Sequence, residues 1–308
     1  MKIPHKIAIV IFVFSFGCLS AQDFPYYYFS NFNPMVNNPA FAAAESEIRA
    51  DAGIYTLWAG GYKPLNDYLV SFSISPNTKL KKQKRATGYE KKIGLGAVFL
   101  RERFGAFSQN NFQLNYAYHF PISKHAFLSF GIALSVENLY IDVNSLTPIN
   151  QEDPRLLTGN NSSVLFDGGF GTALHGRNYM VSLSIMNLAS DDFKFDDVPA
   201  KGINNYTKLY ISGEYSIELS PNIYLKPKIV VRNSRTKKYN FDPSMAVDFN
   251  FFVVGFGFRS ENSLHFFTKI PYKDFFFTYS SENPIESNHM FGNGHTFALG
   301  WSFNSPRL

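Results

Sequence analysis

The stretch His295-Thr296-Phe297-Ala298-Leu299-Gly300-Trp301-Ser302-Phe303, near the carboxyl end of the chain, predicts the fold. Large side chains occupy every second position, and the residues between them are small. Side chains of a β-strand point alternately to the two faces of its sheet, so this stretch predicts a strand with one bulky face and one small face. A last strand that ends in an aromatic residue indicates an outer-membrane β-barrel.

The same alternation recurs along the chain and predicts an all-β antiparallel barrel of about fourteen strands. In one segment, bulky Phe130, Ile132 and Leu134 alternate with small or polar residues, so the bulky set is expected to face lipid. A soluble β-sandwich also alternates, but its polar face normally carries more Lys, Glu and Thr than this chain has there. The expected strands cover residues 49–58, 68–75, 92–101, 111–119, 126–137, 164–174, 178–186, 206–218, 222–232, 241–249, 252–260, 262–269, 272–281 and 295–303.

The connections between these strands are expected to sort by length onto the two sides of the membrane. Long connections, at 138–163, 187–205 and 282–294, all fall on the outer side. Tight connections fall on the periplasmic side and run through Pro121, Gly176, Pro221, Asn250 and Pro271. The connection 76–91 breaks the pattern, and indicates either a basic periplasmic arm or a miscounted strand.

The beginning of the chain predicts its compartment. Lys2, His5 and Lys6 precede an apolar run at 7–19, and small residues follow at 20–21, which is typical of a secretory signal peptide. The run is too short to span a bilayer, and the residues before Cys18 lack the leucine of a lipidation motif. The expected division is a signal peptide at 1–21, an aromatic N-terminal segment at 22–48 and a barrel at 49–308, in the outer membrane as a multi-pass protein.

Composition and charge exclude several other classes. The net charge of +5 comes from a basic cluster at 79–92, and the rest of the mature chain has slightly more acidic than basic residues. This balance argues against nucleic-acid binding. The chain is 45% hydrophobic and 17% aromatic, but it offers no second stretch long enough for a transmembrane helix. Its apolar surface must therefore be spread over strands, and outer-membrane lipid is an expected partner.

The segment 23–44 is too aromatic to hang free in water. It is expected to pack inside the periplasmic half of the barrel as a plug, or against a partner. Its two Asn-Pro pairs favour turn chemistry, since Pro fixes φ and Asn bonds nearby backbone. The alternative is a docking surface, with the candidate partner-binding residues Phe32, Asn33, Pro34, Asn38, Pro39 and Phe41.

The outer connection 187–205 carries four acids and two aromatic residues. Asp191, Asp192, Asp196 and Asp197 do not follow the spacing of a calcium loop, which favours a solvated loop over a Ca²⁺ site. The neighbouring apolar side chains are expected to be exposed, to close the loop over the barrel or to contact a protein partner. They are Phe193 and Phe195.

No catalytic constellation emerges from the sequence. The histidines have no nucleophile or metal spacing, and the chain has no His-Glu-x-x-His, Gly-x-Ser-x-Gly or phosphate-binding loop. A non-enzymatic protein with no catalytic residues, metal site or cofactor is therefore expected.

Several short motifs, in order over almost the whole mature chain, resemble the PorP/SprF family of outer-membrane proteins of type IX secretion and gliding motility. Two differences are Phe41, where the family usually has Tyr, and Ala43, where it has Gly. The motifs are Phe32-Asn33-Pro34, Asn37-Asn38-Pro39-Ala40-Phe41-Ala42, Leu128-Ser129-Phe130-Gly131, Leu146-Thr147-Pro148-Ile149-Asn150, Asp167-Gly168-Gly169-Phe170-Gly171, Ser184-Ile185-Met186-Asn187-Leu188, Leu225-Lys226-Pro227 and the last strand.

The resemblance implies a barrel that works with type IX secretion components and receives or anchors a secreted surface protein through that protein's C-terminal domain. Two alternatives remain open. One is a channel or small-solute transporter, whose lumen would be unobstructed. The other is a structural subunit of the secretion machine with no cargo of its own.

Overall fold

A computed structural model describes residues 29–57, 65–76, 92–123, 125–145, 161–194, 203–233, 239–260, 263–285 and 292–303. The expected signal peptide, the basic residues 79–91 and Phe195 lie outside these ranges. The strands are β1 (Ile48–Leu57), β2 (Leu65–Ile74), β3 (Lys92–Phe104), β4 (Phe107–Ser123), β5 (Ala126–Ile141), β6 (Ser162–His175), β7 (Tyr179–Met186), β8 (Asp192–Phe193), β9 (Ile203–Asn204), β10 (Lys208–Tyr215), β11 (Ile217–Ser220), β12 (Ile223–Asn233), β13 (Tyr239–Asp248), β14 (Val253–Arg259), β15 (Ser263–Tyr272), β16 (Phe275–Pro284) and β17 (Gly294–Phe303). Short 3₁₀ helices are η1 (Pro34–Val36), η2 (Pro39–Phe41) and η4 (Val143–Ser145).

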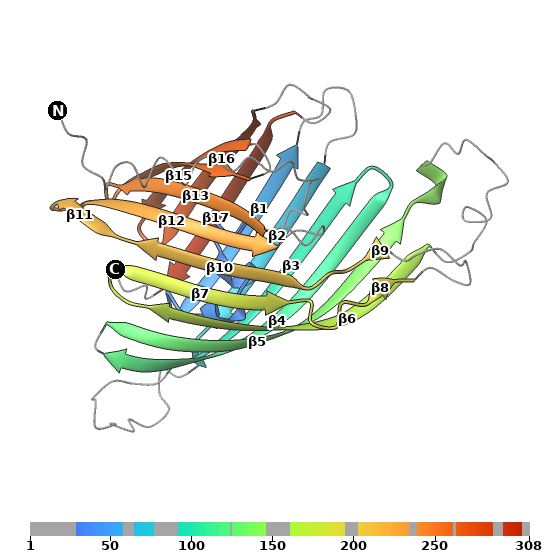
Figure 1. Ribbon diagram of the computed structural model, residues 1–308, viewed down its shortest axis with the longest axis horizontal. Coiled ribbons are helices and arrows are strands. Elements are labelled where there is room, and N and C mark those ends of the chain that lie inside the picture. Colours follow the sequence, from blue (N-terminus) through green and yellow to red (C-terminus); the bar gives the residue numbers. More distant parts are fainter. Residues whose placement is uncertain are drawn as a thin grey trace.

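All of these strands except β8 and β9 form one antiparallel barrel (Figure 1). Its first and last strands pair from Ile48↔Phe303 to Leu57↔Gly294, and a β10–β12 pairing closes the sheet on the other side. The sheet has 15 strands, but β10 and β11 follow one another along β12, so the closed barrel has fourteen positions around it. The expected barrel of about fourteen strands is confirmed. Closure gives hydrogen-bond partners to the backbone N–H and C=O groups that the edge strands of an open sheet would leave unpaired. This pairing is required in a membrane, because the hydrocarbon core offers no water to bond those groups.

The two faces of the wall are those that the alternation predicts. On β5, Ile132 and Leu134 are 53% and 68% exposed on the outside, whereas Ser129 and Glu137 are 0% and 1% exposed. The last strand follows the same rule, with Phe297 and Leu299 exposed and Thr296 and Ala298 buried. Bulky apolar residues therefore cover the outer surface, and small or polar ones line the lumen.

The described connections sort by length as expected with one exception, the two-residue turn at 105–106, which joins β3 to β4 at the end that carries the long connections. Five short connections lie at one end, here named the short-turn end: those between β4 and β5, and at 176–178, 221–222, 249–252 and 273–274. Asn222, Asn250 and Lys273 have positive φ values of 69°, 71° and 55° in three of these turns. The long connections that follow β5, β7 and β16 leave from the opposite end, here named the long-connection end.

Two local expectations were wrong. Pro121 and Pro271 lie within β4 and β15 rather than in turns, because Pro is tolerated near strand ends, where its missing N–H disrupts few ladder bonds. The segment 206–218 is interrupted at Ser216, between β10 and β11. The connection 187–205 contains the small β8–β9 hairpin. No helix in the described ranges is long and apolar enough to cross a membrane.

Candidate functional site: the inner segment and the lumen wall

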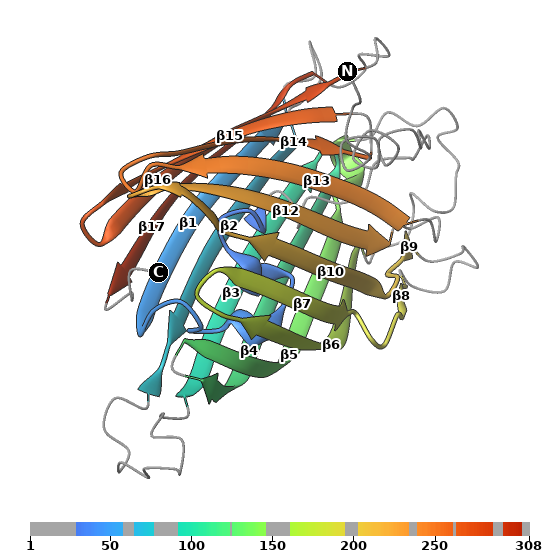
Figure 2. The same cartoon turned by 60° about the vertical axis from the view of Figure 1, so that its left-hand side comes forward.

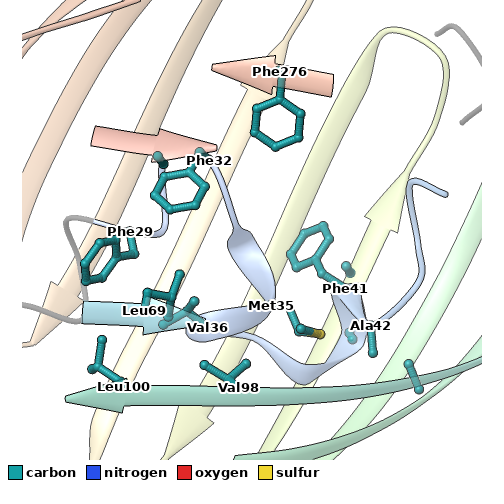
Figure 3. Packing of buried hydrophobic residues seen from close by; sticks show 14 of the residues in the cluster. Phe29, Phe32, Met35, Val36, Phe41, Ala42, Leu69, Val98, Leu100 and Phe276 are labelled. Carbon is teal, nitrogen blue, oxygen red and sulfur yellow. The ribbon is translucent and has the colours of Figure 1, made fainter. Parts of the chain in front are cut away.

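Residues 29–44, here named the inner segment, lie inside the barrel against its lumen-facing side chains (Figure 2). Phe29 and Ala40 are 0% exposed, and the segment shares one buried cluster with residues of seven strands. Figure 3 shows Phe29 and Phe32 near Leu69 of β2, and Met35 near Val98 of β3. The wall contributes Tyr55, Leu69, Val98, Leu100, Ala117, Ala173, Phe276 and Ala298.

Asn33 uses its side-chain amide for two tasks at once. Its oxygen accepts from the Met35 backbone N–H at 3.1 Å and so caps η1, where Pro34 occupies the first position. Its nitrogen donates to Asp51 of β1 at 3.0 Å and to Ser71 of β2 at 2.6 Å. One side chain therefore fixes a turn of the inner segment and also attaches that turn to the wall.

Asn38 repeats this arrangement on the opposite side of the segment. Its oxygen accepts from the Ala40 N–H at 2.9 Å and caps η2. Its nitrogen donates to the carbonyl oxygens of Thr172 on β6 and Leu183 on β7, at 3.2 and 3.3 Å. The turn chemistry expected of both Asn-Pro pairs is present, and the wall contacts add a role that the sequence did not indicate.

Glycines on the lumen face make room for the backbone of the inner segment. A Cβ atom added at Gly94 would lie 1.8 Å from the Ala42 carbonyl oxygen, and one added at Gly131 would lie 2.3 Å from the Ala40 nitrogen. At Gly171 it would lie 2.0 Å from the Asn38 side-chain oxygen. Since such distances are far inside van der Waals contact, these three positions accept only Gly while the inner segment holds its place.

Arg49 of β1 holds the inner segment by a hydrogen bond and is itself positioned by two carboxylates outside that segment. Its guanidinium contacts both Asp51 oxygens at 3.0 Å and Glu45 at 2.5 Å, and it donates to the Phe32 carbonyl oxygen. Its Cζ atom lies 5.1 Å from the centre of the Phe276 ring. Arg49 and Asp51 are 9% and 4% exposed, so this ion pair is largely removed from water.

A hydrogen-bonded chain also fixes the end of the inner segment. His119 Nε2 lies 2.9 Å from the Ala42 carbonyl oxygen, which can only accept, so this nitrogen carries the proton. His119 Nδ1 must then accept from the Ser129 hydroxyl at 2.7 Å, and Ser129 accepts from His175 Nε2 at 3.1 Å. Each donor in this series of hydrogen bonds has an acceptor, which defines the tautomers of both histidine rings.

The hydrogen bonds and the glycine contacts lie in the half of the barrel next to the short turns. Gly94 is near the start of β3, Gly131 is in the first half of β5, and Gly171 is near the end of β6. These strand ends all lie at the short-turn end, although β3 is joined there to β2 by the longer connection 75–91. The inner segment is therefore an ordered part of the lumen at the short-turn end.

The loop after β7 differs from the expectation. Phe193 is 3% exposed and lies in β8, so the prediction of an exposed aromatic residue there was wrong. The loop folds back onto β6: the Leu188 N–H donates to the Gly168 carbonyl, and the Lys194 N–H donates to Ser163 Oγ at 2.9 Å. Asp167 accepts from the Ala189 N–H at 3.0 Å. These contacts cover Phe193, which packs the loop rather than presenting an apolar tip.

The structure brings together six of the sequence-derived candidates and separates them from the seventh. Within the described chain, these six belong to the inner segment, whereas Phe193 lies in the loop beyond β7. Sequence reasoning missed Gly94, Arg49 and His119. Gly94 could have been identified, because a glycine on an otherwise alternating strand is a signal that another part of the backbone approaches closely. The six are Phe32, Asn33, Pro34, Asn38, Pro39 and Phe41, of which all but Pro34 are buried.

Solved structures with the same architecture are outer-membrane barrels. The Ralstonia pickettii toluene transporter TbuX is 8% identical, with a TM-score of 0.51, and the match covers 88% of this chain and 93% of that one. The monoaromatic hydrocarbon channel CymD is 10% identical, with a TM-score of 0.51 over 88% and 92% of the two chains. The Pseudomonas putida toluene transporter TodX is 9% identical, with a TM-score of 0.50 over 88% and 93%. At such low identity these likenesses establish the fold alone.

The sequence itself identifies the family. No curated protein matches the chain significantly. A family model for the type IX secretion system membrane protein PorP/SprF matches residues 19–303, which include the inner segment and every strand of the barrel. The chain therefore belongs to the PorP/SprF family of type IX secretion membrane proteins, and it is a β-barrel of the outer membrane.

Proposed function

We propose that this barrel docks a secreted surface protein at the outer membrane through that protein's C-terminal domain, without making or breaking covalent bonds. The family places the chain with the type IX secretion apparatus, whose components are its expected neighbours. The docking partner and the absence of catalysis belong to the proposal.

The way in which the inner segment is held carries the proposal. Two Asn side chains, the Arg49 guanidinium and a His–Ser–His chain attach residues 29–44 to β1, β2, β4, β6 and β7. A segment attached at so many points is a permanent plug rather than a gate that opens for each solute. A plugged lumen suits a protein that holds a partner better than it suits a diffusion pore.

The docking surface is then the long-connection end rather than the inner segment. Phe32, Asn33, Asn38 and Phe41 are each 9% exposed or less, so they brace the barrel instead of meeting a partner. The described part of the loop after β7 is held against β6 through Asp167 and Ser163, which gives residues 187–194 a fixed position at that end. A preformed surface loses less conformational entropy when a partner binds.

The direct test is purification of the tagged, full-length chain from native outer membranes in mild detergent, followed by mass spectrometry. We expect a secreted protein in near-stoichiometric amount, and its retention should be lost when its C-terminal domain is deleted. Recovery of secretion components alone would instead support a structural subunit and contradict docking.

Planar-bilayer recording tests the competing role of a channel or small-solute transporter; CymD is a monoaromatic hydrocarbon channel and TbuX is a toluene transporter. We expect little ion conductance from the intact chain. Substantial conductance with residues 29–44 still in place would overturn the plug and favour a pore.

A further inference from the structure

Two cationic side chains lie on the outer, lipid-facing side of the barrel wall. Arg101 and Arg103 of β3 are exposed and alternate with the buried Leu100 and Glu102, so both arginines point away from the lumen. Elsewhere in the described ranges, the outward positions of the barrel strands hold no Lys, Arg, Asp or Glu. Two neighbouring positive charges on an otherwise uncharged surface indicate a local function.

The arginines lie at the level of the lipid headgroups. Short turns face the periplasm in outer-membrane barrels, so the long-connection end, where β3 ends, faces outward. On the neighbouring strand β4, the outward residues are all apolar or aromatic from Phe112 to Ile122. That span matches the about 9–11 residues that a strand needs to cross a bilayer. Asn110 is the next outward residue beyond the span, and it is directly opposite Arg101.

The strand register shows the same boundary on the neighbouring strands. One row of outward residues across β2 to β6 is wholly apolar, and consists of Val70, Phe99, Phe112, Val136 and Phe166. The next two rows toward the long-connection end are polar or carry Tyr on β2 to β5. These eight residues, here named the arginine patch, are Tyr68, Arg101, Asn110 and Asn138 in the first row and Asn66, Arg103, Ser108 and Tyr140 in the second.

The arginine patch has the chemistry of a phosphate-binding surface. Neither guanidinium makes an ion pair or a hydrogen bond with another residue that the structure describes. Side chains two residues apart on one face of a strand are about 6.5 Å apart, so both guanidiniums can reach one phosphate group. The planar fork of Arg binds two phosphate oxygens at once. The side chains of Asn110 and Ser108, on the adjacent strand, add uncharged hydrogen-bonding groups beside the two charges.

We propose that the arginine patch binds the phosphorylated sugar headgroup of a lipopolysaccharide molecule in the outer leaflet. The outer leaflet of an outer membrane consists largely of lipopolysaccharide, whose lipid anchor is a phosphorylated disaccharide. Arg101 and Arg103 bind the phosphate, and the neighbouring amide and hydroxyl groups bind the sugar. The apolar row below the patch contacts the acyl chains. Tyr68 and Tyr140 are 45% and 43% exposed and flank the arginines, as is usual for aromatic residues at a membrane interface. This lipid contact is separate from the docking of a secreted protein.

The test titrates the full-length barrel, in mild detergent, with bisphosphorylated lipid A, and native mass spectrometry counts the bound lipid. We expect saturable binding of a single molecule. The double variant Arg101→Gln/Arg103→Gln should weaken the affinity at least about tenfold, because each basic residue near an anionic headgroup adds to the attraction. Arg177→Gln is the matched control, since Arg177 is exposed in the turn between β6 and β7 at the opposite end, and this variant should bind like wild type.

Three further probes distinguish the possible sources of phosphate. Dephosphorylated lipid A and phosphatidylglycerol should each bind at least about tenfold more weakly than bisphosphorylated lipid A, and equimolar inorganic phosphate should not displace it. Equal binding by the double variant, or by dephosphorylated lipid A, would overturn the proposal. Equal binding of phosphatidylglycerol would mean a general anionic-lipid surface, and displacement by inorganic phosphate would mean a site for the free ion. Electrophoretic mobility of the unheated barrel reports folding, and the two single variants carry the test should the double variant fail to fold.

Discussion

At the scale of single residues, the side-chain amide explains why the inner segment repeats Asn-Pro. An amide offers an acceptor and two donors on one short side chain. In Asn33 and Asn38 the side-chain oxygen accepts a hydrogen bond within a 3₁₀ turn, and the side-chain nitrogen donates to the barrel wall. Asp would keep the acceptor but lose the donors, and Ser would reach less far.

Asn38→Ala should lower the free energy of unfolding by about 1–3 kcal/mol, because it removes one cap and two wall hydrogen bonds. Denaturant titration of the barrel in detergent measures this change. The exposed Asn178 provides the control, and Asn178→Ala should stay within about 0.5 kcal/mol of wild type. Equal effects of the two substitutions would contradict the double role of Asn38.

Arg49→Gln should destabilise the barrel by about 3–5 kcal/mol, since it leaves Asp51 buried without its counter-charge. The double variant Arg49→Gln/Asp51→Asn should recover part of that loss, because it removes the uncompensated charge as well. A double-mutant cycle on the same titration separates the two terms. If the double variant has no higher unfolding free energy than Arg49→Gln, the uncompensated charge of Asp51 is not the cause of the loss.

At the scale of elements, the glycines of β3, β5 and β6 and the inner segment fit one another. Gly131→Ala should lower the unfolding free energy by about 1–3 kcal/mol through overpacking and should raise bilayer conductance if the segment is displaced. Gly168→Ala is the control on β6, because a Cβ atom there would lie 3.4 Å from its nearest neighbour, an ordinary contact. Indistinguishable variants would mean that the segment moves aside freely.

At the scale of the whole molecule, the apolar outer surface sets the position of the barrel in the membrane. Leu134 is in the middle of β5 and is 68% exposed, so Leu134→Arg should lower the unfolding free energy by about 2–4 kcal/mol. Tyr140, near the end of the same strand, is 43% exposed. Tyr140→Arg should change stability by no more than about 1 kcal/mol, since charges near the interface are tolerated. The comparison is made in lipid bilayers, and equal losses would place the membrane elsewhere on the wall.

Much of this architecture is local and could be predicted. Alternation of side chains determines which face of each strand is apolar, so the sequence determined the barrel, its number of strands and the residues that meet lipid. The Asn-Pro turns are also local, because Pro fixes φ and the Asn oxygen reaches a backbone N–H two residues on.

The rest depends on residues distant in sequence. Only the closed barrel brings Asn38 to Thr172 and Leu183, and Ala42 to His119. The burial of Phe193 under its own loop and the opposition of Arg101 and Asn110 likewise arise from strand register and loop path. The sequence alone thus determined the wall, because its period is a property of neighbouring residues. Only the tertiary structure decided what fills the lumen, because that depends on contacts across it.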